Sequence, residues 1–145
     1  MYLLDTDHLS LIQRGSDLGQ TILKRLIASN QPFGTTIVTY EEQSRGWLAH
    51  LSRAKQLDEQ VVAYRFLQQH ATHYRAISLI PFDQAAAQIY THLRKIYPRL
   101  GTMDLRIAAI ALTQQATLLT RNQSDFSQIV ELRTEDWSKA PADLA

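Results

Sequence analysis

The chain of 145 residues has the length of one typical domain, and 45% hydrophobic with 20% charged residues is a globular rather than a disordered composition. Because cysteine is absent, disulfides, iron–sulfur clusters and thiolate zinc sites are excluded, and any metal must be held by oxygen or imidazole ligands. The net charge of +1 neither requires nor excludes a nucleic-acid partner, since a local basic stripe fits within a balanced total.

The apolar runs of the sequence are short. The run before Asp5 is only about four residues long, too short for the hydrophobic region of a signal peptide. No later run approaches the ~20 apolar residues of a membrane span. We therefore expect a cytoplasmic protein with no membrane segment and a single domain over residues 1–145.

The first part of the chain alternates strand and helix patterns. The expected elements are a strand over 1–5, helices over 8–15 and 17–30, and a strand over 33–39. Leu18, Ile22 and Leu26 repeat at four-residue spacing and form one apolar helix face. The β-branched residues after Pro32 fit a pleated strand better than a helix.

A long helical stretch follows, from about 40 to 75. We expect two helices, broken near Gly46 to Ser52, that form a helical hairpin arm. The second helix carries an apolar stripe that contains Leu57, Val61, Tyr64 and Leu67. Packing into the core is one interpretation of this stripe, and a surface for a partner is another.

The second half continues the alternation. The expected elements are a strand over 76–82, helices over 83–98 and 101–115, a strand over 116–122, a possible strand over 129–134, and a frayed tail from about 138. Uniformly apolar strands that alternate with helices need cover on both faces. The sequence therefore predicts an α/β fold, a three-layer α/β/α sandwich with a central, mostly parallel sheet of four to five strands.

Acidic and amide side chains follow several of these strands or begin a later helix. They are Asp5, Glu41, Glu42, Asp104, Asn122 and Asp125. Because the carboxyl ends of parallel strands meet at one edge of a sheet, we expect these side chains to converge there. Clustered carboxylates repel one another, and a divalent cation relieves that repulsion. Oxygen ligands favour hard ions such as Mg²⁺ or Mn²⁺.

Each acid also has a purely structural interpretation. Asp5 is a good turn or helix-cap residue, Thr39 with Glu42 matches a capping box, and Asp104 compensates a helix dipole. The other acids are interpreted structurally: Asp7 and Asp83 as helix caps, Asp125 as a surface turn residue, and Asp136 beside Trp137 as a solvated pair. The prediction of a metal site depends on the convergence of several acids and not on any one of them.

Four segments carry a family resemblance. "LLDTDHLS" (3–10), "TTIVTYEEQSRG" (35–46), "MDLRIAAIAL" (103–112) and "LLTRNQSDF" (118–126) resemble, in order and spacing, the signature segments of PIN-domain ribonucleases. The likeness is greatest to the VapC-type toxins of bacterial toxin–antitoxin pairs and spans nearly the whole chain. The resemblance implies a single PIN domain with a PIN-like sandwich fold.

The resemblance also implies site residues. The first three acids of the family fall on Asp5, Glu42 and Asp104, which would hold Mg²⁺ (or Mn²⁺). The fourth position falls on Asn122, where many members have Asp. Asn keeps an oxygen ligand but loses the charge, so a second metal would be held more weakly, and Asp125 is a partial substitute. The hydroxyl of Thr6 is expected to help orient the site.

The activity implied is Mg²⁺-dependent endoribonuclease cleavage of RNA, for example a transfer RNA, which inhibits translation and growth. A cation bound to these acids would lower the pKa of a coordinated water for in-line attack on the phosphate. The resemblance further implies a homodimer and a cognate antitoxin in a groove near the site. At least half of the many basic residues are interpreted as solvated helix faces. Arg45, Arg106 and Arg121 are the RNA-binding candidates because each lies near a proposed ligand.

Other functional classes remain open. The first alternative is a catalytically weak or silent PIN-like module that binds RNA or protein. It is plausible because Asn122 stands where many members of the family have Asp. A receiver-type domain is disfavoured because no strand after the third ends in the required Asp. His70 and His73 lack a third metal partner and are assigned to the surface, and the scattered glycines exclude a phosphate-binding loop.

Overall fold

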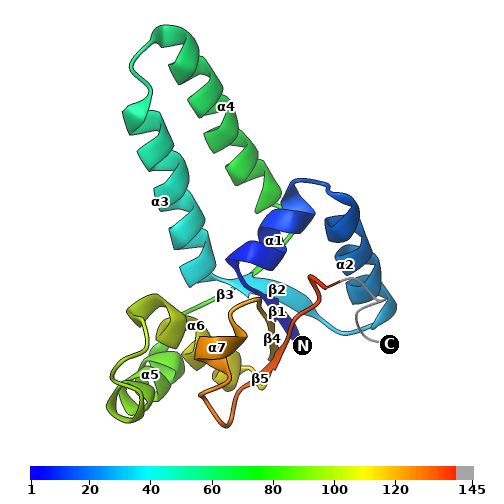
Figure 1. Ribbon diagram of the computed structural model, residues 1–145, viewed down its shortest axis with the longest axis vertical. Coiled ribbons are helices and arrows are strands. Elements are labelled where there is room, and N and C mark those ends of the chain that lie inside the picture. Colours follow the sequence, from blue (N-terminus) through cyan, green and yellow to red (C-terminus); the bar gives the residue numbers. More distant parts are fainter. Residues whose placement is uncertain (140–145) are drawn as a thin grey trace.

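The computed structural model describes residues 1–139, which fold around a parallel sheet (Figure 1). Its strands are β1 (Tyr2–Leu4), β2 (Phe33–Thr36), β3 (Ser78–Ile80), β4 (Thr117–Leu119) and β5 (Arg133–Glu135). The order across the sheet is β3-β2-β1-β4-β5, and every neighbouring pair is parallel. The predicted α/β class with a parallel central sheet is confirmed.

Helices cover both faces of the sheet. They are α1 (Thr6–Gln13), α2 (Asp17–Ala28), α3 (Ile37–Arg53), α4 (Leu57–His73), α5 (Gln84–Ile96), α6 (Thr102–Thr113) and α7 (Gln123–Phe126). Figure 1 shows α1 and α2 on one side of the strands and α5 and α6 on the other. Within residues 1–139, each helix is too short or too polar to cross a lipid bilayer.

The two central strands supply both halves of the core because successive side chains of a strand point to opposite faces. Leu3 and Leu118 lie in the cluster formed with α5 and α6, whereas Leu4 and Leu119 lie in the cluster formed with α1 and α2. All four side chains are essentially inaccessible to solvent. This alternation fixes the register of β1, and therefore the position of the residue that follows it.

The contact between α1 and α2 depends on a glycine. A Cβ added at Gly19 would lie 2.0 Å from the carbonyl oxygen of Leu11. The two helix backbones therefore meet closely only because residue 19 has no side chain. The turn between them uses Gly15, whose φ of +66° favours glycine.

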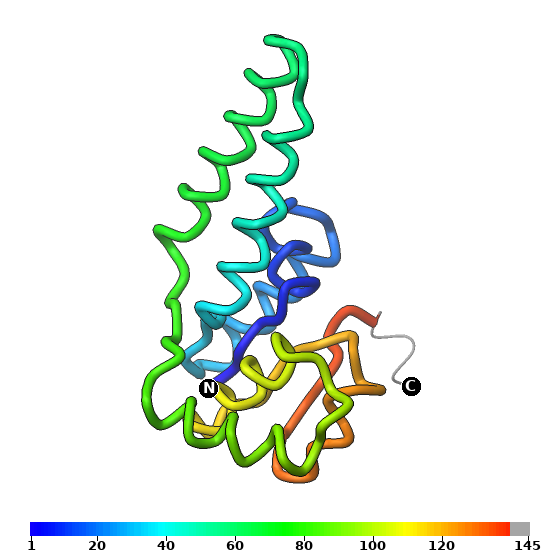
Figure 2. The backbone as a smooth tube through the Cα atoms, turned by 90° about the vertical axis from the view of Figure 1, so that its left-hand side faces the viewer, coloured from blue at the N-terminus to red at the C-terminus, as the bar shows by residue number. Residues whose placement is uncertain are grey.

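The helices α3 and α4 form a hairpin that extends away from the sheet, which we call the arm (Figure 2). The predicted break near Gly46 to Ser52 is wrong, because α3 continues to Arg53 and the chain turns at 54–56. The predicted strand over 33–39 is also too long. The hydroxyl of Thr36 accepts the backbone N–H of Thr39, so this N-cap begins the helix at Ile37.

The last part of the chain differs from expectation in its boundaries. β5 lies at Arg133–Glu135, later than the predicted 129–134, because Ile129 and Leu132 are buried beside α7 in the core cluster. Of the predicted tail from about 138, residues 140–145 lie outside the described residues.

Candidate metal centre

A pocket of about 220 Å³ opens at the carboxyl edge of the sheet, and we call it the acidic pocket. Its lining residues are Asp5, Thr6, Asp7, Glu42, Asp104, Ile107, Asn122 and Phe126. β1 and β4 flank the point where the strand order changes direction, which is where open α/β sheets bind ligands. The pocket thus brings together Asp5, Glu42, Asp104 and Asn122, which come from four separate elements.

Asp5 ends the central strand and begins α1. Its backbone N–H donates to the carbonyl of Leu119, which extends the pairing of β1 with β4 by one residue. Its Oδ1 accepts the backbone N–H of His8 at 2.9 Å, so Asp5 is the N-cap of α1. The prediction that Asp7 is a cap is therefore wrong. Asp7 lies in the first turn and is exposed.

Glu42 enters the pocket from the arm. Because α3 begins at Ile37, Glu42 lies in the second turn and cannot serve the capping box predicted with Thr39. Burial, followed by the charges of Asp104 and Asp5, raises the pKa of the Glu42 carboxyl. The adjacent Glu41 faces elsewhere and pairs with Arg45 at 2.6 Å.

Asp104 lies in the first turn of α6, where the helix dipole favours a negative charge. The loop before α6 is held by Arg94, whose guanidinium donates to the carbonyls of Pro98 and Leu100 and to the hydroxyl of Thr102. Burial raises the pKa of Asp104, and the charges of Asp125 and Asp5 raise it further.

Asn122 follows β4 at the start of α7. Its Nδ2 donates to the carboxylate of Asp125 at 3.1 Å, and its Oδ1 accepts from the hydroxyl of Ser124 at 3.3 Å. Asp125 was expected as a surface turn residue, but it is partly buried in α7 and its charge acts on Asp104. The amide therefore links a further carboxylate, that of Asp125, to the edge of the pocket.

The chemistry of the pocket fits a hard divalent cation. Its donors are carboxylate, amide and hydroxyl oxygens, with no imidazole among the lining residues. Within residues 1–139, no three acidic or histidine side chains already stand in a metal-binding cluster. Burial, followed by the charges of neighbouring carboxylates, raises the pKa values of Glu42 and Asp104, so a cation would be favourable beside them. Mg²⁺ usually keeps several of its waters, so carboxylates can hold it through a bound water as well as directly.

None of the three proposed RNA-binding arginines lines the acidic pocket. Arg45 and Arg106 line a neighbouring pocket of about 510 Å³ on the other side of α3. Arg106 also stacks over the ring of Tyr90, with its guanidinium carbon 5.9 Å from the ring centre. Arg121 is exposed and directly precedes Asn122.

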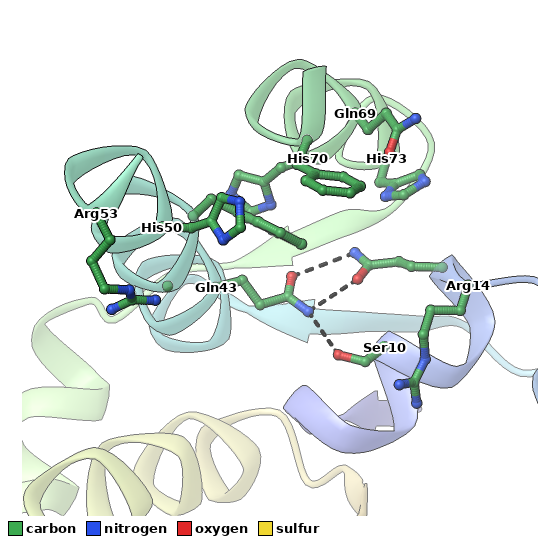
Figure 3. A pocket seen from close by; sticks show the side chains of 12 residues that line it. Ser10, Arg14, Gln43, His50, Arg53, Gln69, His70 and His73 are labelled. Atoms are coloured by element: carbon green, nitrogen blue, oxygen red, sulfur yellow. Dashed lines mark hydrogen bonds between the residues drawn. The ribbon is translucent and has the colours of Figure 1, made fainter. Parts of the chain in front are cut away.

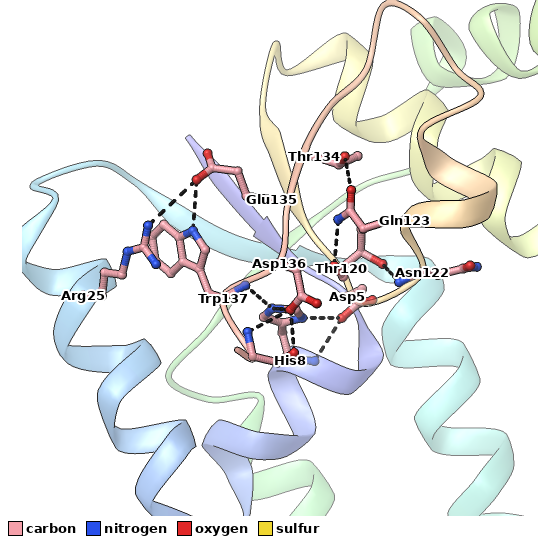
Figure 4. A network of polar contacts seen from close by, with 11 residues as sticks. Asp5, His8, Arg25, Thr120, Asn122, Gln123, Thr134, Glu135, Asp136 and Trp137 are labelled. Carbon is pink, nitrogen blue, oxygen red and sulfur yellow. Dashed lines mark hydrogen bonds and ion pairs between the residues drawn. The ribbon is translucent and has the colours of Figure 1, made fainter. Parts of the chain in front are cut away.

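Two histidines are buried that the sequence did not identify. His70 was assigned to the surface, but it is 5% exposed, stacks on Tyr40 and lies 2.7 Å from the hydroxyl of Ser44. His8 is fully buried beside Asp5 (Figure 4). The contact of His70 with Ser44 depends on α4 packing against α3, so spacing along the chain gives no signal for it. The contact of His8 with Asp5 is local, between residues three apart at the start of α1.

A separate pocket of about 750 Å³ lies between α1 and the arm, and none of its lining residues is acidic (Figure 3). The amide of Gln43 closes one side of it through hydrogen bonds to Ser10 and Gln13. Gln43 follows Glu42 in α3, so one turn of the arm helix contributes to both pockets. These bonds hold the base of the arm against α1.

Comparisons with known proteins agree with this architecture. The sequence profile described as "PIN domain" matches residues 2–132. No curated protein matches the chain. One similar solved structure is VapBC2 from Rickettsia felis bound to a DNA fragment from its promoter. It is 25% identical, with a TM-score of 0.68 over 94% of this chain and 98% of that chain.

Two further structures share the fold. VapBC-1 from nontypeable Haemophilus influenzae is 22% identical, with a TM-score of 0.71 over 95% of this chain and 98% of that chain. FitAcB from Neisseria gonorrhoeae is also 22% identical, with a TM-score of 0.71 over 97% of this chain and 100% of that chain.

Proposed function

The chain belongs to the PIN domain family, and on this premise we propose that it is a Mg²⁺- or Mn²⁺-dependent endoribonuclease, the toxin of a VapBC-type toxin–antitoxin pair. The observation that carries the proposal is the acidic pocket, in which Asp5, Glu42 and Asp104 meet and the pKa values of two of them are raised. Acids arranged to repel one another at a strand edge favour a cation as their natural partner.

In this proposal Asp5, Glu42 and Asp104 hold the cation, directly or through water, and Asn122 completes the catalytic set. A divalent cation bound there supplies an activated water and neutralises charge on the scissile phosphate. Asp104 and Glu42 bind it best when ionised, so their raised pKa values make the cation compete with protons. Thr6 lines the same pocket and offers a hydroxyl beside the carboxylates.

The substrate proposed is RNA, for example a transfer RNA. Arg45, Arg106 and Arg121 are proposed to contact its backbone, since phosphates are bound through Arg and Lys in a salt-dependent way. Arg45 must exchange its pairing with Glu41 for a phosphate in order to do so. We further propose a cytoplasmic homodimer whose cognate antitoxin covers the site, in keeping with the toxin–antitoxin complexes that share this fold.

One observation favours an alternative, a catalytically weak or silent PIN-like module that binds RNA or protein. Both ends of the Asn122 amide are already hydrogen-bonded, to Asp125 and Ser124, and the amide carries no charge. Such a module would bind RNA without cutting it. Metal-dependent cleavage distinguishes the two functions.

The test is cleavage of structured RNA by the purified protein with Mg²⁺ or Mn²⁺ and with EDTA. We expect cleavage only with the metal, and a loss of at least about 100-fold in Asp5→Asn, Glu42→Gln and Asp104→Asn. Glu41→Gln is the matched control for metal dependence, because Glu41 is the neighbour of Glu42 and lies outside the acidic pocket. It also releases Arg45 from its pairing, so it should change RNA affinity and leave the metal dependence of cleavage intact. Equal cleavage in EDTA, or by Asp5→Asn, would rule the mechanism out.

A further inference from the structure

His8 is a fully buried polar residue that the proposed chemistry does not use. It lies in the first turn of α1 and is 0% exposed, and it does not line the acidic pocket. Its Nδ1 lies 3.2 Å from Oδ1 of Asp5. An apolar side chain would be the ordinary occupant of such a buried position, so the presence of an imidazole has to be explained by its hydrogen bonds.

The hydrogen bonds of the ring define its tautomer. The backbone N–H of Trp137, 129 residues away in sequence, donates to Nε2 at 3.1 Å. A nitrogen that accepts a hydrogen bond must offer its lone pair, so the ring proton lies on Nδ1. Nδ1–H therefore donates to Asp5. The carboxylate of Asp136 lies 3.6 Å from Nε2 and instead accepts hydrogen bonds from the backbone N–H and the hydroxyl of Ser138.

Trp137 is itself held firmly. Its indole, 6% exposed, lies under the guanidinium of Arg25, which is 3.9 Å from the ring centre, and packs against the ring of Tyr2. Its Nε1 donates to Glu135 at 3.1 Å (Figure 4). The sequence predicted Asp136 and Trp137 as a solvated pair, and this is wrong because the indole anchors the end of the sheet to α2 and α1.

The two oxygens of Asp5 are in different situations. Oδ1 receives both the backbone N–H and the Nδ1–H of His8. Oδ2 has no hydrogen bond within residues 1–139, and in that part of the chain no buried side-chain oxygen lacks a partner. Oδ2 is therefore open to solvent at the acidic pocket, which Asp5 lines.

We propose that His8 is a positioning residue for Asp5: it holds Oδ1 so that Oδ2 stays directed to a divalent cation, and Trp137 fixes its tautomer. This inference rests on the proposed metal-binding function. A donor that orients a metal-ligating group typically changes metal affinity by about 10–100-fold when it is removed.

Two substitutions separate the roles of the two ring nitrogens. In His8→Asn, the amide nitrogen lies at the same distance from the backbone as Nδ1 and can still donate to Asp5. In His8→Gln, the amide oxygen reaches the position of Nε2 and can still accept from Trp137, but the donor to Asp5 is lost. Both variants keep a buried polar side chain, so they are matched for the cost of burial.

The readout is the affinity of the metal-free protein for Mn²⁺, measured by electron paramagnetic resonance of the free ion. We expect His8→Gln to bind Mn²⁺ about 10–100-fold more weakly than the parent and His8→Asn to stay within about threefold. Equal affinity of His8→Gln and the parent, or equal weakness of both variants, overturns the role of His8. A parent that does not bind Mn²⁺ overturns the proposed function and this inference together.

Nitrogen-15 spectra of the unsubstituted protein provide a second test that needs no variant to fold. The imidazole of His8 is expected to carry its proton on Nδ1, with the chemical shift of an unprotonated nitrogen at Nε2. A proton on Nε2 instead would overturn the inference, because Nδ1 would then have no hydrogen to give to Asp5.

Discussion

The arm and the rest of residues 1–139, which we call the body, bury their side chains very differently. In the body, Leu3, Leu105 and Leu118 are 0% exposed. In the arm, Leu57 is 75% exposed and Val61 is 55% exposed, and the main packing of α4 is against α3. The body therefore supplies most of the stability, since stabilisation scales with the apolar area removed from water.

The acidic pocket lies where these two regions meet. Asp5, Asp104 and Asn122 belong to the body, whereas Glu42 belongs to the arm helix. A cation held by Glu42 and the body acids would join the two regions. We therefore expect substitutions in the body to change the free energy of unfolding most, and a cation bound between the body and the arm to raise it.

The largest effect is expected from paired glycine substitutions, one in each region. Gly19→Ala forces a Cβ against the backbone of α1 and should lower the free energy of unfolding by about 2–3 kcal/mol. Gly46→Ala in α3 meets nothing within 4 Å and should raise it by about 0.5–1 kcal/mol. Urea denaturation measures both. A harmless Gly19→Ala would contradict the close packing of α1 on α2.

The next effect is stabilisation by the metal. At a Mn²⁺ concentration 100-fold above the dissociation constant, the free energy of unfolding should rise by about 2.7 kcal/mol. Glu42→Gln should lose most of this gain, because it removes the only acid that the arm contributes to the acidic pocket. Glu41→Gln should keep it. Equal gains in both variants would show that the arm does not take part in the site.

A smaller effect is expected from removing a pocket charge in EDTA. The raised pKa of Asp104 means that the unfolded chain releases this proton at lower pH than the folded protein does. Stability therefore falls as the pH rises through that interval, and the loss persists above it. Asp104→Asn should remove the loss and stabilise the apo protein by roughly 0.5 kcal/mol at pH 7, given the solvent screening of a half-buried group.

Urea denaturation of this variant and the parent at several pH values measures the difference. The stabilisation by Asp104→Asn should shrink as the pH is lowered to the ordinary range of an Asp carboxyl. A stabilisation that is independent of pH would mean that the raised pKa is not its cause. With saturating Mn²⁺ the sign should reverse, since the variant then loses a ligand.

The smallest effect is expected on the arm surface. Leu57→Gln and Val61→Thr change exposed side chains and should alter the free energy of unfolding by less than about 0.5 kcal/mol in the monomer. If the arm instead packs in the proposed homodimer, both variants should weaken association. Denaturation at two protein concentrations, with sedimentation, separates these outcomes.

Local patterns predicted the frame of the fold well. Apolar runs located β1 to β4, whereas β5 begins only at Arg133, near the end of the predicted 129–134. The rule for parallel strand ends led us to expect Asp5, Glu42, Asp104 and Asn122 at one edge, and all four line the acidic pocket. The boundary between β2 and α3 was misplaced because β-branched Ile37 and Val38 favour a strand. The side-chain cap of Thr36 outweighs that preference and begins the helix there.

Long-range contacts could not be predicted from one sequence. The bond between His8 and Trp137 joins residues at opposite ends of the chain, and no spacing rule reports it. The bond between Asn122 and Asp125 is local, whereas the effect of Asp125 on Asp104 joins segments that are distant in the sequence. Such contacts depend on how the elements pack, which composition and periodicity do not specify.

The most direct test of the account is anomalous X-ray diffraction from crystals grown with Mn²⁺. We predict one strong manganese peak in the acidic pocket, bound by Asp5, Glu42 and Asp104 directly or through a single water. A protein that cleaves RNA with Mn²⁺ while the pocket shows no peak, or with the peak elsewhere, would contradict the account.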